Sequence, residues 1–311
     1  MSTFSLFTIP TLPHHTSYAP SHTLSLLSPS SMNLLKLHHI PRRLSAVTFR
    51  RISISAAAVR QDTNLWSTTP LISVSPEAES LFHISIDVSD YPELASSYTK
   101  PGQYLQLRVP NVEKPSFLAI ASPPKVAVNK GVFEFLVKSV SGSTAELLCG
   151  LNRGDAVELS QVMGNGFDLN QISPAETYQT VVIFATGSGI SPIRSLIEAG
   201  FGADKRSDVR LYYGARNLKR MGYQVCWLLA ACRQFLSSLW QKYKVVPVLS
   251  QPDNAWKGER GYVQAAFSRA KNIFTPQSTG AVLCGQKQMA EEVTSLLVAD
   301  GVSTEKILKN F

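Results

Sequence analysis

The chain has 311 residues, a formal net charge of +8 and 44% hydrophobic residues. Six of its 30 Lys and Arg residues lie in residues 1–60, which contain no Asp or Glu, so the remaining 24 basic and 22 acidic residues leave a net charge of only +2. This near balance gives no support for a nucleic-acid-binding surface, and the length beyond residue 60 suffices for one large or two ordinary domains.

Residues 1–60 have the composition of an organelle transit peptide, because they combine eleven Ser and six Thr with basic residues and no acidic ones. Their apolar runs, LSLLSP and MNLLKL, are too short for a secretory signal or a membrane span. We expect a disordered leader that directs the protein to the chloroplast (plastid stroma), with cleavage near residues 56–58. A disordered basic tail is the alternative.

Histidine and cysteine usage limits the possible chemistry. Only His83 lies outside the leader, which argues against a Ser-His-Asp triad or a site built from several histidines. Because His83 lies in the alternating run LFHISIDV, we expect it in a core or at a strand edge. No C-x-x-C spacing occurs, so the sequence predicts no metal site and no iron–sulfur cluster.

The first folded part, residues 66–172, is expected to be an antiparallel six-stranded β-barrel. Six short runs are rich in Val, Ile, Leu and Phe: WSTTPLISVSP, LFHISIDV, GQYLQLRVP, SFLAIASP, GVFEFLVKSV and DAVELSQV. Turn residues such as Pro92 and Asn129-Lys130-Gly131 separate them. One helix is predicted in this part, at residues 144–151.

The second part, residues 175–311, has a different rhythm. Apolar strand runs at residues 178–185, 208–214, 243–250 and 280–285 are each followed by a segment with helical spacing. These helical segments lie near residues 191–200, 217–240, 261–272 and 287–300. Strands that alternate with helices predict an α/β domain with a doubly wound parallel sheet.

Segment 224–240, QVCWLLAACRQFLSSLW, is apolar almost all round, unlike a surface helix, and it is too short to span a bilayer. A buried helix, a contact surface and a gene-model error stay open as explanations.

The stretch FATGSGISPIRSL, residues 184–196, places two glycines one residue apart between a buried strand and a helix. Such a turn exposes backbone N–H groups at a helix N-terminus and can bind a phosphate. Pro192 replaces the third glycine of G-x-G-x-x-G, so the usual dinucleotide fingerprint is incomplete. A simple turn is therefore the alternative for this motif alone.

The order of four segments is more specific: ATGSGISPI, LYYGARN, VLSQPDNAWKGERGYV and LCGQKQM. In this order they resemble the nicotinamide domain of the ferredoxin–NADP reductase superfamily. Within this superfamily, they are similar to the plastid FAD/NAD(P)-binding oxidoreductases of plants. The resemblance covers about residues 66–311. It implies a FAD-binding barrel followed by an NAD(P)-binding α/β domain.

The resemblance also implies which residues bind the nicotinamide nucleotide: Thr186, Gly187, Ser188, Gly189, Pro192, Arg216, Lys219, Arg220, Cys284, Gly285 and Met289. The glycine turn would hold the pyrophosphate, and the three cations would receive a 2′-phosphate if one is present, although a solvated helix start explains them as well. Cys284 would lie beside the position of hydride transfer without acting as a nucleophile, a buried thiol being the alternative.

The barrel part departs from the family pattern R-x-Y-S, whose Arg contacts the flavin pyrophosphate and whose Tyr lines the ring. Ser116 replaces this Arg and Leu118 replaces this Tyr. The other residues expected near FAD are Ala119, Ile120, Ala121, Ser122, Gly142, Ser143, Thr144, Gly164, Gly166 and Phe167. Phe311 is a candidate to cover the flavin ring, with a core phenylalanine as the alternative.

The resemblance implies a flavin-dependent NAD(P)H oxidoreductase, a flavoprotein that passes hydride between nicotinamide and FAD and then electrons to an unknown acceptor. That acceptor could be a redox protein such as ferredoxin. A non-catalytic NAD(P)-binding sensor or scaffold that has lost FAD is the alternative. A flavin-free dehydrogenase is less favoured because no Tyr-Lys pair or His presents itself as an acid or base.

Overall fold

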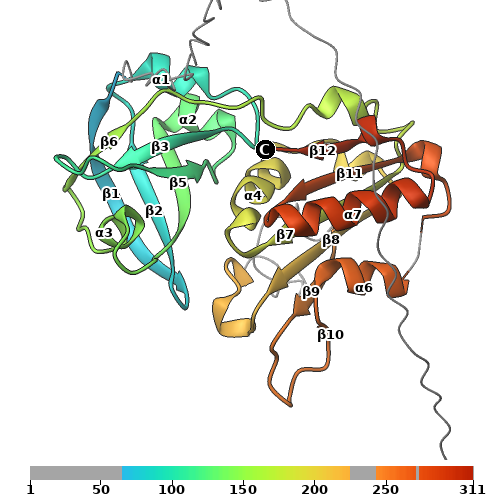
Figure 1. Cartoon of the computed structure of the whole chain (residues 1–311). Coiled ribbons are helices and arrows are strands. Elements are labelled where there is room, and N and C mark those ends of the chain that lie inside the picture. Colours follow the sequence, from blue (N-terminus) through green and yellow to red (C-terminus); the bar gives the residue numbers. More distant parts are fainter. Residues whose placement is uncertain (1–64, 225–242, 271–272, 311) are drawn as a thin grey trace, which may run out of the picture. The chain divides into compact units, whose positions relative to one another are not determined.

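The computed structural model describes residues 65–224, 243–270 and 273–310 (Figure 1). The predicted transit peptide, the apolar segment beyond Gln224 and Phe311 lie outside the described residues. All described residues belong to one compact unit of the chain, Arg60–Phe311.

Six antiparallel strands form the first sheet, in the order β4-β3-β6-β1-β2-β5. These strands are β1 (Ser67–Ala78), β2 (Leu81–Asp87), β3 (Tyr104–Arg108), β4 (Ser116–Ala119), β5 (Val132–Lys138) and β6 (Ala156–Leu159). An antiparallel bridge between Ile120 and Phe135 joins the two edges of the sheet, so it closes into a barrel. All six predicted strands are present. Their alternating apolar residues point to a common core.

Three helices accompany the barrel, whereas the sequence predicted one. The predicted helix is α3 (Thr144–Cys149), and the two that were missed are α1 (Pro92–Ser97) and α2 (Pro124–Lys130). Residues taken for turns belong to these helices, since Pro92 begins α1 and Lys130 ends α2. Proline fits the first turn of a helix because its missing N–H has no partner there, and Gly131, with φ of 61°, terminates α2.

The second sheet is parallel, with the strand order β10-β9-β8-β7-β11-β12. Its strands are β7 (Thr180–Thr186), β8 (Asp208–Ala215), β9 (Lys244–Leu249), β10 (Glu259–Arg260), β11 (Thr279–Cys284) and β12 (Ile307–Lys309). The fold class is thus confirmed. The edge strands β10 and β12 were not predicted, because two or three residues are too few to show periodicity.

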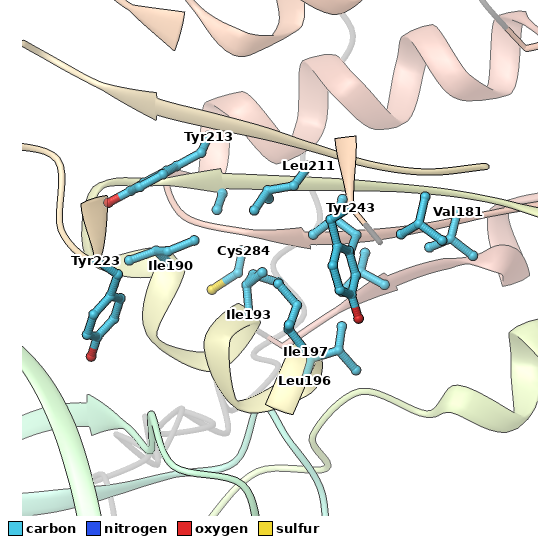
Figure 2. Packing of buried hydrophobic residues seen from close by; sticks show 14 of the residues in the cluster. Val181, Ile190, Ile193, Leu196, Ile197, Leu211, Tyr213, Tyr223, Tyr243 and Cys284 are labelled. Atoms are coloured by element: carbon cyan, nitrogen blue, oxygen red, sulfur yellow. The ribbon is translucent and has the colours of Figure 1, made fainter. Parts of the chain in front are cut away.

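Helices cover both faces of this sheet. Along β7, Val181 and Ile183 pack with α4 (Ile190–Ala199), whereas Val182 and Phe184 point to the face covered by α6 (Val263–Ala270) and α7 (Lys287–Ala299). Figure 2 shows the α4 side, where helix residues and strand residues converge around the Cys284 thiol.

The strand order places β7 beside β11, although almost a hundred residues separate them in sequence. The chain runs from β7 outward through β8, β9 and β10, and then returns to the other side of β7. Ligands of doubly wound sheets bind at the carboxyl ends of strands where the order reverses in this way. The predicted glycine turn after β7 and Cys284 at the end of β11 therefore meet at this switch point.

Among the described helices, none combines the length and the apolar character required to cross a membrane.

Candidate active site

A pocket of about 440 Å³ opens at the carboxyl ends of the parallel strands. The nucleotide domain lines it with residues that include Thr186, Gly187, Ser188, Gly214, Arg216, Arg220, Ser250, Gln251, Tyr262, Gln286 and Met289. The barrel contributes Glu79, Ser80, Leu81 and Lys138. Both domains therefore form the walls of one pocket, and six of the predicted nucleotide-binding residues lie on them.

Gly187 presents open backbone to this pocket. Its φ of 55° lies in the left-handed region, and no atom lies within 4 Å of the position that a Cβ would occupy. The turn continues as a 3₁₀ segment, Gly187–Gly189, into α4. A ligand anion could approach this backbone closely, where the N-terminus of the ten-residue helix adds partial positive charge.

Gly189 is required by contacts within the protein. A Cβ on this residue would lie 2.5 Å from the carbonyl oxygen of Cys284 and 2.8 Å from the Cα of Gly285. A Cβ on Gly285 would likewise collide with the hydroxyl of Thr186, which accepts a hydrogen bond from the N–H of Gln286 at 3.1 Å. The two glycines thus let the turns after β7 and β11 touch.

Pro192 is the third residue of α4 and is buried. It lies in the first helical turn, where the N–H groups have no intrahelical partner, so proline causes no loss of a hydrogen bond.

The predicted cation cluster is only partly in the pocket. Arg216, just after β8, is exposed and lines the pocket, as does Arg220 in the short 3₁₀ turn Leu218–Arg220. Arg220 donates from Nε and Nη2 to Oε1 of Glu79, at 2.9 and 2.6 Å. Lys219 is exposed and is not among the residues that line the pocket.

Cys284 is 7% exposed, and burial raises the pKa of its thiol to about 12, against a smaller opposing effect of a hydrogen bond with Asn310. The thiol therefore stays protonated at neutral pH and is a poor nucleophile. The side-chain nitrogen of Asn310 lies 3.5 Å from the carbonyl oxygen of Gly102. The end of β11 is in this way close to the barrel.

On the barrel side, Ser116 and Leu118 lie on the core face of β4. Their cross-strand partners in β3 are Leu107 and Leu105, both fully buried, and Leu118 packs against the barrel core. Ala119 reaches the nucleotide domain instead, because its carbonyl oxygen accepts a hydrogen bond from Ser191 of α4 at 3.0 Å.

The following residues, Ile120, Ala121 and Ser122, are fully buried. The Ser122 hydroxyl accepts a hydrogen bond from the N–H of Glu134, and the Ser122 carbonyl oxygen accepts one from the hydroxyl of Tyr98. Packing inside the barrel is sufficient to explain this Ile-Ala-Ser segment.

Sequence reasoning missed the aromatic pair on the opposite face of β3 and β4. Tyr104 and Phe117 lie with their ring centroids 6.2 Å apart, and Phe117 is 63% exposed. Gly164 packs directly against the Tyr104 ring, which leaves no room for a Cβ. The alternation of GQYLQLRVP could have revealed this face, because Leu105 and Leu107 point inward and their neighbours outward.

The α3 N-terminus, at Gly142, Ser143 and Thr144, is closed by hydrogen bonds with Glu146 that resemble a capping box, with Gly142 in place of the N-cap residue Ser143 as the backbone donor. The N–H of Gly142 donates to Oε2 of Glu146 at 2.7 Å, and the N–H of Glu146 donates to Oγ of Ser143 at 3.4 Å. The Thr144 hydroxyl donates to the carbonyl oxygen of Lys114. The Glu146 carboxylate thus lies where the sequence predicted a pyrophosphate.

The segment with Gly164, Gly166 and Phe167 packs on the barrel. A Cβ on Gly166 would lie 2.8 Å from the carbonyl oxygen of Pro101, which accepts a hydrogen bond from the N–H of Phe167 at 2.7 Å. The buried Phe167 ring lies against Gly102. These contacts alone are enough to require a small residue at position 166.

A half-buried ionic cluster that the sequence did not reveal joins α4 to the barrel. Arg194 donates from Nη1 to Glu134 of β5 and from Nε to Glu198 of α4, both at 2.8 Å. Burial raises the pKa of Glu134, but His83, whose Nε2 lies 3.8 Å away, and the Arg194 charge lower it more, to about 2. The cluster positions the helix whose N-terminus borders the pocket.

Within the described ranges, no group of three or more His, Cys, Asp or Glu side chains could hold a metal ion.

An antiparallel barrel followed by a doubly wound parallel sheet is the architecture that this chain shares with solved two-domain reductases. Residues 183–295 match the family described as the oxidoreductase NAD-binding domain. A ferredoxin NADP⁺ reductase from Neisseria gonorrhoeae, solved with bound FAD and NADP, has the same fold, with a TM-score of 0.62, 18% identity, and coverage of 79% of this chain and 99% of that one.

The chain belongs to the ferredoxin–NADP reductase superfamily of NAD(P)H-dependent flavin oxidoreductases. It is 46% identical over 280 residues to the fruit protein pKIWI502 of Actinidia deliciosa. This alignment covers 88% of this chain and 85% of that protein. It is also 27% identical to the gamma subunit of sulfhydrogenase 1 from Pyrococcus furiosus, over 70% of this chain and 69% of that subunit.

Proposed function

We propose that the protein oxidises NAD(P)H, passes the hydride to a bound FAD and delivers the electrons to a second redox partner. The observation that carries this proposal is the pocket at the switch point, whose walls come from both domains. The pocket leaves open space beside the Gly187 backbone, which a bound pyrophosphate would require. Cys284 is the last residue of β11, the strand that pairs with β7.

For the nucleotide, the Gly187 turn and the α4 N-terminus would hold the pyrophosphate, and Arg216 and Arg220 the adenosine end. A guanidinium binds phosphate through two parallel hydrogen bonds, so this pair favours NADPH over NADH. Burial keeps the Cys284 thiol uncharged. This thiol would pack beside the nicotinamide ring of the bound nucleotide and exclude water from it.

For the flavin, the residues fit the ring better than the pyrophosphate. The exposed Phe117 ring and Tyr104 offer an aromatic surface on the outer face of the barrel, near Ala119 and its contact with α4. The Arg of the family pattern is absent, and Glu146 occupies the α3 N-terminus. When bound, a flavin supplies the hydride and single-electron chemistry, while the protein contributes orientation and water exclusion.

The acceptor is proposed to be a separate redox protein such as ferredoxin. One relative, 26% identical over 77% of this chain, is the electron transfer component XylA of the xylene/toluene monooxygenase from Pseudomonas putida, of which the chain covers 64%. The described residues contain no metal-binding cluster that could serve as a second redox centre.

The plastid is the proposed location, supported by the acid-free, Ser-rich composition of residues 1–60. A fusion of these residues to a fluorescent protein should accumulate in chloroplasts. A cytosolic or mitochondrial distribution of the fusion would contradict this location.

The decisive experiment is the visible spectrum of the purified chain, before and after reconstitution with FAD and then after anaerobic addition of NADPH. Flavin bands that bleach on addition of NADPH support the proposed reaction. If the protein binds NADP⁺ but takes up no flavin even from excess FAD, the reaction is refuted and a nucleotide-binding sensor or scaffold takes its place.

A further inference from the structure

The tip of the β1–β2 hairpin brings an acidic residue into the nucleotide pocket. Glu79 belongs to the barrel, yet it lines the same pocket as Gly187, Arg216 and Ser250 of the nucleotide domain. Its carboxylate receives two hydrogen bonds from Arg220, at 2.6 and 2.9 Å. One of the two arginines on the pocket wall is thus already bound to a carboxylate of the chain.

The position of Glu79 is fixed by backbone contacts on both sides of the turn. Its N–H donates to the carbonyl oxygen of Lys219 at 2.6 Å, and the carbonyl oxygen of Ser80 accepts a hydrogen bond from the N–H of Ser139 at 2.9 Å. Ser80 has a φ of 61°, a conformation that costs free energy for a residue with a side chain. The hairpin tip is therefore held against the turn that carries Arg220.

The electrostatic surroundings agree with this placement. The pKa of the Glu79 carboxyl is lowered, first by the hydrogen bond with Arg220 and further by the charges of Lys219 and Arg216, although burial acts in the opposite direction. Glu79 thus carries its negative charge at neutral pH, and its pKa is lowered by the same three cations that the sequence suggested for a 2′-phosphate.

We propose that Glu79 is a specificity-determining residue that competes with the 2′-phosphate of NADP(H) for Arg220 and so reduces the preference of the pocket for NADP(H) over NAD(H). An exposed ion pair contributes little to stability, so the 2′-phosphate can displace the Glu79 carboxylate from Arg220. The displaced carboxylate then repels the phosphate, because both groups are negatively charged. NAD(H) has no 2′-phosphate and leaves the pair intact. The inference rests on the proposed function only in requiring that the pocket bind a nicotinamide dinucleotide.

The test is calorimetric titration of the full chain with NADP⁺ and with NAD⁺, for the wild type and for Glu79→Gln. Glu79→Gln removes a negative charge near the expected position of the 2′-phosphate, so NADP⁺ should bind more tightly while NAD⁺ binding changes little. The ratio of the NAD⁺ to the NADP⁺ dissociation constant should therefore rise about three- to tenfold. In an Arg220→Gln background, adding Glu79→Gln should raise this ratio less than it does in the wild-type background, since the competition requires Arg220.

Glu259→Gln is the matched control. Glu259 forms a similar exposed pair with Arg269, at 2.6 Å, and does not line the nucleotide pocket, so the ratio should not change. An equal loss of affinity for both nucleotides in Glu79→Gln, or an unchanged ratio, overturns the inference and makes Glu79 a structural link. Absence of binding by the wild type for either nucleotide overturns the proposed function and this inference together.

Discussion

Gly187 and Gly189 are one residue apart, and alanine is expected to have different effects at the two positions. At Gly189 the added methyl group would collide with the backbone of Cys284, so we expect a loss of about 1–3 kcal/mol in the free energy of unfolding. At Gly187 the methyl group would enter the open pocket, and the positive φ costs about 1–2 kcal/mol.

Urea unfolding and NADP⁺ titration together separate these two effects. Gly187→Ala should weaken NADP⁺ binding beyond what its stability loss explains, because the methyl group lies where the ligand approaches. A Gly189→Ala variant with wild-type stability would show that the turns after β7 and β11 can move apart.

Phe117 provides a second test at the residue scale, because a side chain that is 63% exposed contributes little to the folded core. Base–aromatic stacking is worth about 1–3 kcal/mol, and we expect Phe117→Ala to weaken FAD binding by a comparable amount without lowering the melting temperature. Quenching of flavin fluorescence measures the affinity. Exposed Val298 on α7 gives a matched control, Val298→Ala, and equal FAD affinity of both variants would exclude Phe117 from the flavin site.

At the scale of the element, α4 connects the pocket to the barrel through Arg194 and Glu134. Because the pKa of Glu134 is lowered to about 2, its contribution to stability is present above its ordinary pKa of 4.5 and is lost as the pH falls toward 2. A shift of this size corresponds to about 3 kcal/mol at neutral pH.

The difference in unfolding free energy between the wild type and Glu134→Gln should therefore shrink as the pH is lowered from neutral toward 3. Glu291→Gln, which removes an exposed partner of Lys287 on α7, should show little difference at any pH. A Glu134→Gln difference that stays constant with pH would mean that the carboxylate is not stabilised by this cluster.

At the scale of the whole molecule, the nucleotide pocket has walls from both domains. Binding of NADP⁺ should therefore slow hydrogen exchange in the β1–β2 hairpin around Glu79 to Leu81, as well as in the turn at residues 186–191. Native-state exchange followed by mass spectrometry measures both regions in one experiment. Protection confined to the nucleotide domain would show that the barrel does not contribute to the bound state.

Much of the fold followed from the sequence, because periodicity and turn residues act over short distances. All six barrel strands and the four longer strands of the parallel sheet were predicted, as was the fold class. The helices α1 and α2 were missed because each has only six or seven residues and begins with a proline that also suits a turn. The edge strands β10 and β12 depend on pairing with distant neighbours, which a local pattern does not contain.

For the site, the sequence alone determined the glycine turn, its position between a strand and a helix, and the order of segments that identifies the family. Only the tertiary structure decided that Gly189 is needed for contact with the β11 turn, that Leu118 lies on the core face and that Glu146 caps α3. The Glu79–Arg220 pair likewise joins residues 141 positions apart. Such pairings depend on how two domains meet in space, and charge–charge contacts between distant residues leave no periodic trace in the chain.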